Sequence, residues 1–329
     1  MMKIGWILSG SRNVAGARIQ GWNMHDYFIK KGINSEIIRS DFFNYELNLT
    51  KEEIKQIMNQ GFDLIILQKI ASGEIFDYFV DQAHKKGIKV IFIGIDKINV
   101  GFAIKCDAII VVSKFLKRLI PKEHHKKTFI VFDGYEHSNK VYKHHTKSKK
   151  IKLIYITNCV SSKFPILETL PKDVSLTIIG PPEERVKRFQ PDQTLFTETP
   201  YNFKYVVWSL DKIDKEVLKG DIGVIPYKSK NINKDYVKAK SANRLILFMS
   251  YGMPVIASPT AEYKPIIKQG INGFIAKDSE GWIKLIEKLR DNPGFRKIIG
   301  TKARDFVKDK YSLEAQGDLY LKIINKCLR

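Results

Sequence analysis

The segment KSANRLILFMSYGMPVIASP, Lys240–Pro259, decides the fold because it joins a polar helix start to a buried helix and then to a short buried strand. Leu245–Met249 is apolar on every side, which predicts a helix enclosed between a sheet and another layer. Gly252 and Pro254 end that helix. Val255–Ala257 then reads as a strand of an open α/β sheet, whose carboxyl edge is where such sheets bind ligands.

The start of the predicted helix, Ala242–Met249, carries side chains suited to an anion. Unpaired backbone N–H groups and the helix dipole favour negative charge at a helix start. Arg244 can grip a phosphate with two parallel hydrogen bonds. An ordinary helix with a solvated basic start is the alternative interpretation. The polar side chains at this start are Lys240, Ser241, Asn243 and Arg244.

Length and charge narrow the class of protein. The chain has 329 residues, which suits two domains of roughly 150 residues each. Its 56 Lys and Arg against 35 Asp and Glu give a formal charge of +21. Such a charge favours an anionic partner, namely membrane headgroups, nucleic acid or a phosphorylated substrate. A general lysine bias spread along the chain would explain the same net charge without any anionic partner.

Cysteine, histidine and hydropathy patterns exclude several classes. The three cysteines are far apart and lack metal-ligand spacing, so neither a disulfide framework nor a zinc site is expected. The histidines have no carboxylate or cysteine at ligand spacing, and no Asp-x-Asp is present, so no metal is expected. The cysteine pattern leads us to expect a reduced, cytoplasmic protein. Because no apolar run approaches the roughly 20 residues that span a bilayer, any association with a membrane is expected to be peripheral, at its inner face.

Apolar strands alternate with helix-length segments in both halves, as parallel sheets covered by helices require. In the first half the expected strands are Lys3–Leu8, Ser35–Arg39, Asp63–Gln68, Lys89–Ile95, Ala108–Val112 and Thr128–Phe132, and the helices are Gly16–Lys31, Lys51–Gln60, Glu74–Lys86 and Lys114–Ile120. In the second half the strands are Ile151–Thr157, Ser175–Gly180, Tyr205–Val207, Ile222–Pro226, Val255–Ala257 and Gly273–Ala276. The helices there are Phe164–Leu170, Asp211–Lys219, Ala242–Met249, Ala261–Lys268, Glu280–Arg290, Phe295–Lys310 and Leu313–Leu328.

A polar, basic stretch without hydrophobic period separates the halves. We therefore expect an α/β protein with a Rossmann-like domain over 1–134, a linker over 135–150 and a second Rossmann-like domain over 151–329. The two domains would face each other across a cleft. The final helix would be able to cross back to the first domain.

Four landmarks of the second half, taken in order, carry a family resemblance: DIGVIPY at Asp221–Tyr227, KSANR, YGMPVIASP, and GINGFIA at Gly270–Ala276. They resemble the donor-binding domain of retaining GT-B glycosyltransferases of the family 4 (group 1) type. AGARIQGWNMHDYFIKKG at Ala15–Gly32 and DLIILQKIAS at Asp63–Ser72 resemble the first domain of the same group more faintly.

The resemblance implies GT-B architecture, with an acceptor domain followed by a nucleotide-sugar donor domain. It implies transfer of a sugar from a nucleotide-sugar to a glycan, lipid-linked or other cell-envelope acceptor, with retention of configuration and without metal or other cofactor. Polysaccharide biosynthesis would be the setting.

This chain departs from the family pattern at two places. The family's paired glutamates, the second of which binds the ribose, fall on Ala239 and Leu247, so the chain is a divergent member. Glu262 is the nearest carboxylate that would substitute. The Arg and Lys that meet the leaving diphosphate in the family fall on Asn158 and Lys163, so Arg244 and Lys240 would supply the missing charge.

The roles expected from this comparison are as follows. Arg18 and Lys69 lie on the acceptor side, and Asp96 would accept a proton or bind an acceptor hydroxyl. Catalytic residues are Lys163, Arg244 and Asp96, and donor-binding residues are Lys240, Ser241, Asn243, Arg244, Ser258 and Glu262.

Three alternatives remain open at this point. The same fold would act on DNA, where positive charge tracks phosphates. A catalytically inactive GT-B protein that binds a glycan or a nucleotide would explain the residues at Ala239, Leu247 and Asn158. A GT-B sugar-nucleotide epimerase is the weakest, because it requires carboxylates that the sequence does not place.

Overall fold

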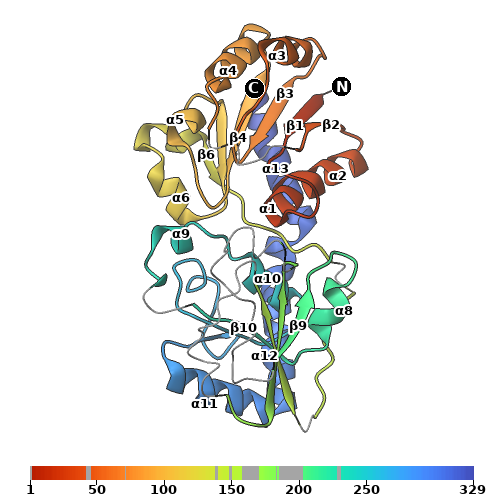
Figure 1. Ribbon diagram of the computed structural model, residues 1–329, viewed down its shortest axis with the longest axis vertical. Helices are drawn as coiled ribbons and strands as arrows, with labels where there is room; N and C mark the ends of the chain where they lie inside the picture. The colour runs from red at the N-terminus through yellow and green to blue at the C-terminus, as the bar shows by residue number, and fades with distance from the viewer. Residues whose placement is uncertain are drawn as a thin grey trace. The chain divides into compact units, whose positions relative to one another are not determined.

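The computed structural model describes residues 2–41, 46–70, 72–137, 140–147, 150–157, 170–182, 184, 203–227 and 231–329 (Figure 1). The chain divides into two compact units. The first holds Met1–Glu136, Lys238–Ser241 and Tyr311–Arg329, and the second holds His137–Val237 and Ala242–Lys310. The segment Lys238–Ser241 therefore belongs to the first unit, although it immediately precedes a helix of the second.

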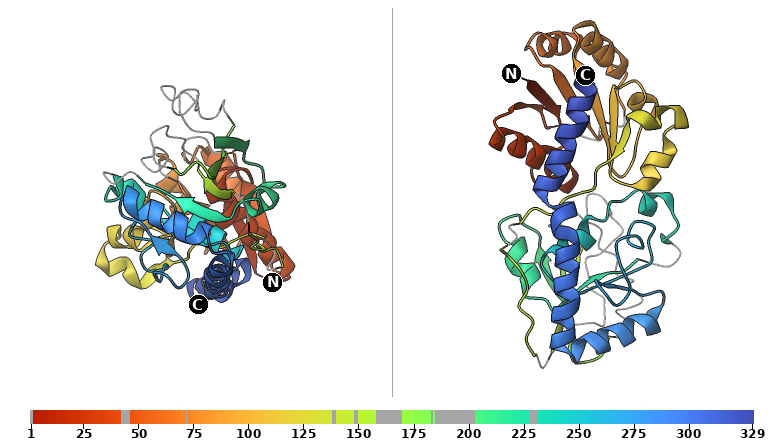
Figure 2. Two further views of the ribbon diagram at one scale, coloured as in Figure 1. Left: turned by 90° about the horizontal axis from the view of Figure 1, so that it is seen from below. Right: turned by 180° about the vertical axis from the view of Figure 1, so that it is seen from behind.

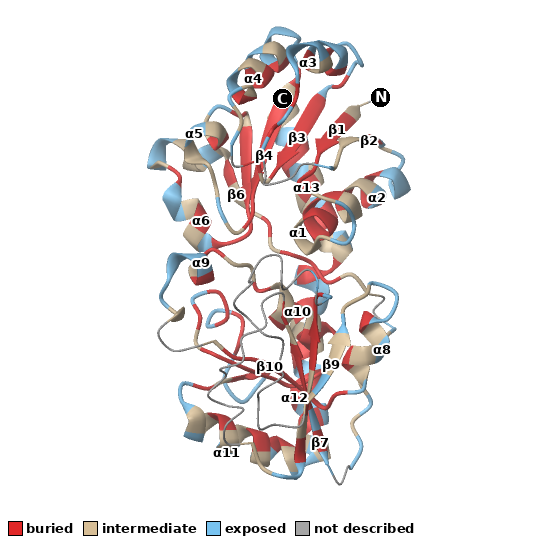
Figure 3. Cartoon of the chain, viewed as in Figure 1, coloured by how far each residue is buried: buried red, intermediate tan, exposed pale blue. Residues whose placement is uncertain are grey.

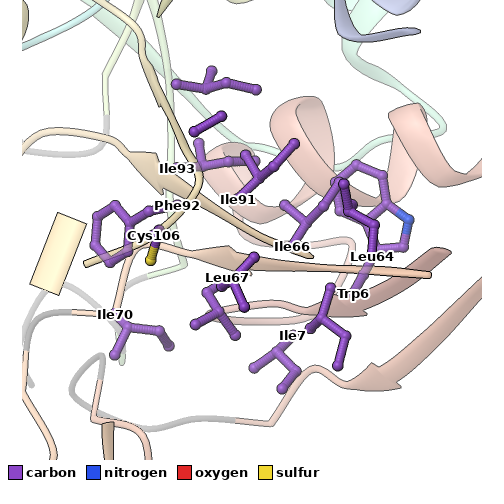
Figure 4. Close-up of a cluster of buried hydrophobic side chains, with 14 of the residues drawn as sticks. Trp6, Ile7, Leu64, Ile66, Leu67, Ile70, Ile91, Phe92, Ile93 and Cys106 are labelled. Carbon is purple, nitrogen blue, oxygen red and sulfur yellow. The ribbon is translucent and has the colours of Figure 1, made fainter. Parts of the chain in front are cut away.

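The first unit contains a six-stranded parallel sheet in the order β2-β1-β3-β4-β5-β6. Its inner strands are apolar almost throughout, as expected for a parallel sheet buried on both faces. Figure 4 shows the core beside it, in which Trp6, Ile66 and Phe92 are fully buried. The strands are β1 Lys3–Ile7, β2 Asn34–Arg39, β3 Leu64–Gln68, β4 Lys89–Gly94, β5 Ala108–Val111 and β6 Thr128–Ile130.

Helices cover both faces of this sheet (Figure 2). The C-terminal helix α13, Leu313–Leu328, is one of them, and its Tyr320 ring lies 6.3 Å from that of Trp6. The others are α3 Lys51–Met58, α4 Phe76–Lys85, α5 Val100–Ala103, α6 Lys114–Leu119 and the 3-10 helix Lys122–Lys127.

The helix expected over Gly16–Lys31 is interrupted. It forms α1 Ala15–Ala17, a π-helical turn Arg18–Trp22 and α2 Asn23–Lys30. At Gly21 this segment approaches the end of β1 so closely that a Cβ would lie 2.5 Å from Leu8. A π-turn of this kind often marks a functional site.

The second unit contains another six-stranded parallel sheet, in the order β12-β11-β10-β7-β8-β9. Its strands are β7 Ile151–Ile156, β8 Val174–Gly180, β9 Phe203–Val207, β10 Ile222–Ile225, β11 Val255–Ala257 and β12 Phe274–Ile275. Figure 3 shows that the inner strands, like those of the first sheet, are largely buried. The helices are α8 Ile213–Leu218, α9 Asp235–Lys238, α10 Asn243–Ser250, α11 Ser279–Arg290 and α12 Pro293–Tyr311.

The predicted end of α10 is confirmed. Gly252 has a φ of 69°, the left-handed conformation of a helix C-cap, and its N–H donates to the Met249 carbonyl over 2.9 Å. Met253 N–H donates to Phe248 over 3.1 Å, which completes the cap. Pro254 follows, and β11 begins at once.

One predicted helix is wrong. Ala261–Lys268 forms consecutive turns instead of an α-helix. Pro265 has no N–H to donate to the Ala261 carbonyl, and its ring crowds the preceding turn, so a helix cannot propagate through it. The helix expected over Phe164–Leu170 falls almost wholly outside the described residues, because 164–169 are not described.

Candidate functional site

Polar side chains gather at the carboxyl edge of the first sheet. Lys69 follows β3 and Asp96 follows β4, so parallel neighbours bring the two residues to the same edge. Lys69 Nζ lies 2.8 Å from one Asp96 carboxylate oxygen, and Lys240 Nζ lies 3.3 Å from the other. The structure therefore brings Lys69 and Asp96, which the sequence assigned to the acceptor, together with Lys240, which it assigned to the donor.

Asp96 is ionised at neutral pH in this setting. Partial burial by itself would raise the pKa of its carboxyl group, but the charges of Lys240 and Lys69 outweigh burial and lower that pKa below its ordinary value. Its side chain keeps 37% of its surface exposed. It is therefore a charged acceptor of hydrogen bonds that a ligand can reach.

A buried carboxylate, that of Asp133, follows the edge strand β6 of the same sheet. Asp133 is 5% exposed and accepts a 2.7 Å hydrogen bond from Gln20 and another from the Ser241 hydroxyl. Burial raises the pKa of Asp133, although both of these hydrogen bonds act in the opposite direction. Tyr320 donates to the Gln20 amide oxygen over 2.6 Å. Ser241 is thus held by the first unit.

Arg18 is engaged by an ion pair. Its guanidinium lies 2.8 and 3.0 Å from the two Glu136 carboxylate oxygens and donates to the Arg12 carbonyl over 2.9 Å. Asn23 donates to the same carboxylate over 2.6 Å. These contacts tie the π-turn to the segment that follows β6, and the acceptor-side role of Arg18 stays a prediction.

In the second unit the start of α10 meets the carboxyl edge of the sheet. Its N-cap, Ala242, offers no side-chain hydrogen bond to the helix. Arg244, in the first turn, donates to the Ile156 carbonyl at the end of β7 over 3.2 Å and to the Tyr227 hydroxyl. Its guanidinium carbon lies 5.5 Å from the centre of the Tyr227 ring.

Ser258 and Glu262 complete this edge after β11. The Ser258 hydroxyl accepts a 2.9 Å hydrogen bond from Tyr227 N–H, which ties the ends of β10 and β11 together. Glu262 is 6% exposed and lies in the turn that replaces the predicted helix. Glu262 therefore lies in the segment that follows β11, at the same carboxyl edge as Ser258.

The predicted donor set is divided between the two units. Lys240 and Ser241 belong to the first unit, whereas Asn243, Arg244, Ser258 and Glu262 belong to the second. Lys163, like the position Asn158 that aligns with the family's Arg, lies outside the described residues.

Sequence reasoning missed five further residues at these edges: Gln20, Asp133, Tyr155, Tyr227 and Tyr263. Of these, Asp133 carried a usable signal, since it is a carboxylate that directly follows a predicted strand. The tyrosines carried none, because a tyrosine within a strand or a turn is usually a packing residue.

The described residues offer neither a metal-binding cluster nor a membrane-spanning helix. Among them no group of three or more His, Cys, Asp or Glu side chains is arranged to hold a metal ion. No helix within the described ranges is both long and apolar enough to cross a membrane.

No protein-family model matches the sequence. An uncharacterised glycosyltransferase of Methanocaldococcus jannaschii is 24% identical over an alignment of 248 residues that covers 68% of this chain and 59% of that protein. The chain thus spans about three fifths of the length of this curated relative.

Solved structures match over the whole chain. A glycosyltransferase from Rickettsia africae has a TM-score of 0.71 at 16% identity and covers 100% of this chain and 99% of its own. The chain has the GT-B glycosyltransferase fold. The Anabaena protein HepE, solved with UDP-glucose, has a TM-score of 0.69 at 12% identity and covers 99% of this chain and 100% of its own.

Proposed function

We propose that this GT-B protein is a glycosyltransferase that moves a sugar from a nucleotide-sugar donor to a glycan, lipid-linked or other cell-envelope acceptor. The observation that carries the proposal is Arg244, a cation in the first turn of α10 at the carboxyl edge of the second sheet. A helix start beside a guanidinium suits a diphosphate. HepE, which shares the fold, was solved with UDP-glucose.

In this proposal the second unit holds the donor. Arg244, together with Lys163, meets the negative charge that grows on the leaving diphosphate, so that no metal is required. Asn243 lies beside it in the first helical turn, and Glu262 takes the place of the family's ribose-binding glutamate. Retention of configuration follows the family resemblance.

The acceptor is assigned to the carboxyl edge of the first sheet. Asp96, ionised between two lysines, accepts a hydrogen bond or a proton from the acceptor hydroxyl. Lys69 and Lys240 orient that carboxylate. The formal charge of +21 would hold the protein against an anionic surface that presents the acceptor.

Thermal stabilisation tests the donor site. UDP, GDP, ADP and CMP are each added to the full chain, since a ligand at 100 times its dissociation constant stabilises by about 2.7 kcal/mol. One nucleotide should raise the melting temperature of the wild type and of Lys302→Ala, an exposed control on α12, but not of Arg244→Ala.

The nucleotide that stabilises the protein then selects the sugar-nucleotides to be screened for turnover. A protein that melts at the same temperature with all four nucleotides would contradict the donor site. Nucleotide binding without turnover of any sugar-nucleotide, with and without glycan acceptors, would identify an inactive nucleotide-binding protein instead.

A further inference from the structure

Arg244 is held without a carboxylate partner among the described residues. Its guanidinium donates hydrogen bonds to the Ile156 carbonyl and to the Tyr227 hydroxyl. The other buried guanidinium at a site edge, that of Arg18, is neutralised by Glu136. The charge of Arg244 is therefore met only by neutral groups in the described structure.

Three tyrosines lie at or next to the groups that contact this cation. Tyr227 accepts a hydrogen bond from it, Tyr263 packs against Tyr227, and Tyr155 precedes Ile156, whose carbonyl accepts another hydrogen bond. Tyr155 lies in β7 and Tyr227 follows β10. Tyr263 lies in the turn after β11, and its ring centre is 6.4 Å from that of Tyr227. Tyr155 and Tyr263 are 5% and 2% exposed. We call Tyr155, Tyr227 and Tyr263 the tyrosine cage.

The cage is itself fixed by backbone contacts. Tyr227 N–H donates to Ser258 over 2.9 Å, and Tyr263 N–H donates to the Thr260 hydroxyl over 3.3 Å. Because both contacts come from residues that follow β11, the cage is built on the sheet edge rather than on α10. Burial by itself would lower the pKa of Arg244, but the neighbouring Tyr227, Tyr263 and Tyr155 raise it overall.

We propose that the tyrosine cage consists of positioning residues, which hold Arg244 in place while leaving its charge available to the diphosphate of the donor. A carboxylate would hold the guanidinium equally well, but it would neutralise the charge and compete with phosphate oxygens. A neutral phenol orients the same side chain without that cost. The inference rests on the proposed function, because it assumes that Arg244 binds a diphosphate.

A purely structural role of the tyrosine cage predicts a different result from a positioning role. If the tyrosines only fill the core, their replacement lowers stability and weakens every ligand of the site alike. If they position the Arg244 charge, their replacement weakens a nucleoside diphosphate and leaves the nucleoside unchanged, since the nucleoside lacks the anion. The comparison of the two ligands therefore separates the roles.

The experiment measures dissociation constants by titration calorimetry for UDP and uridine, or for the GDP or ADP pair where the thermal screen selects it. The variants are Tyr227→Phe, Tyr263→Phe, Tyr227→Glu and Arg244→Lys, with Lys302→Ala as control. A melting curve of each variant confirms that it is folded. Tyr227→Phe loses one hydrogen bond to a charged group and should weaken the diphosphate about tenfold.

Tyr227→Glu places a carboxylate beside Arg244 and should weaken the diphosphate further than Tyr227→Phe, while the nucleoside affinity stays within about twofold of wild type. The positioning role of the cage would be overturned if folded Tyr227→Phe and Tyr227→Glu variants bound the diphosphate as tightly as the wild type while Arg244→Lys bound it more weakly. Equal weakening of diphosphate and nucleoside would also overturn it. A wild type that binds no nucleoside diphosphate would instead contradict the proposed function.

Discussion

Lys69 and Asp96 end two adjacent strands in the left-handed backbone conformation and pair with each other. Their φ angles are 57° and 60°, and Lys69 Nζ lies 2.8 Å from the Asp96 carboxylate. Left-handed backbone is unfavourable for a lysine, and among non-glycine residues Asn and Asp tolerate it best. Two such residues side by side indicate a local structure that is kept for a reason other than stability.

Glycine at position 69 should be better tolerated than alanine. Both Lys69→Ala and Lys69→Gly remove the ion pair with Asp96, but glycine adopts a φ of 57° without strain. We expect Lys69→Gly to be more stable than Lys69→Ala by about 1 kcal/mol. Urea unfolding of the two variants measures the difference, and an alanine variant as stable as the glycine variant would show that no strain is stored there.

Asparagine at position 96 should separate acceptor chemistry from folding. Asp96→Asn keeps the side-chain shape and suits a φ of 60°, but it cannot accept a proton. We expect a loss of transfer rate of about 100-fold, with nucleotide affinity unchanged. Steady-state turnover together with calorimetry tests this; a loss of nucleotide affinity without loss of rate would move Asp96 out of the acceptor site.

Much of this first edge was predictable from the sequence, because parallel strands bring the residues that follow them to one place. Lys69 and Asp96 were found in that way. The partner Lys240 was assigned to the donor, and no local pattern shows that a residue 144 positions along the chain pairs with Asp96. The segment Lys238–Ser241 joins the first unit through such contacts.

The second edge was less predictable. The strands β10 and β11 and the cap at Gly252 follow from local patterns of apolar residues, glycine and proline. The helix predicted over Ala261–Lys268 was wrong, because Pro265 prevents a helix from continuing through that segment. The tyrosine cage depends on how three separate strand ends meet, which no window of sequence contains.

Gly300 marks a close approach inside the second unit. A Cβ at this position of α12 would lie 1.8 Å from the Gly252 carbonyl oxygen and 3.1 Å from His145 Nε2. Since the obstacle is backbone, we expect Gly300→Ala to destabilise by about 3 kcal/mol or more. Gly294→Ala, in the same helix, is the control and should change stability by less than about 1 kcal/mol. Thermal unfolding compares the two.

His145 should make stability fall at mildly acidic pH. Its Nε2 lies 2.9 Å from the Gly252 carbonyl, and burial, with Lys143 and Arg296 nearby, lowers the pKa of the ring. The unfolded chain therefore takes up a proton at a higher pH than the folded one does. The neutral His145 ring therefore stabilises the folded state fully above about pH 6.5, and this stabilisation is lost as the pH falls below that value.

The variant His145→Gln, which does not titrate, should show a shallower loss of stability between about pH 7 and pH 5. His144→Gln, at an exposed neighbour, is the matched control and should follow the wild type. Identical pH profiles for His145→Gln and the wild type would show that another group controls this range.

Glu262 is the residue on which ribose recognition can be decided. The family's glutamate position holds Leu247, which has no oxygen, whereas Glu262 is a carboxylate 6% exposed at the same sheet edge. A carboxylate that accepts hydrogen bonds from ribose hydroxyls contributes about 1.5–3 kcal/mol, or roughly 10- to 150-fold in affinity. The wild type should therefore bind UDP more tightly than 2′-deoxy-UDP if the 2′-hydroxyl is one of the groups recognised.

Glu262→Gln should abolish that preference by weakening UDP toward the affinity of 2′-deoxy-UDP, because the amide is a poorer acceptor than the carboxylate. Arg244→Lys should weaken both nucleotides by the same factor, since both carry the diphosphate. A preference for UDP that survives in Glu262→Gln would assign the ribose to another residue. If the wild type shows no preference, this divergent site does not use the 2′-hydroxyl. The glutamate that Leu247 replaces would then have no substitute in this chain.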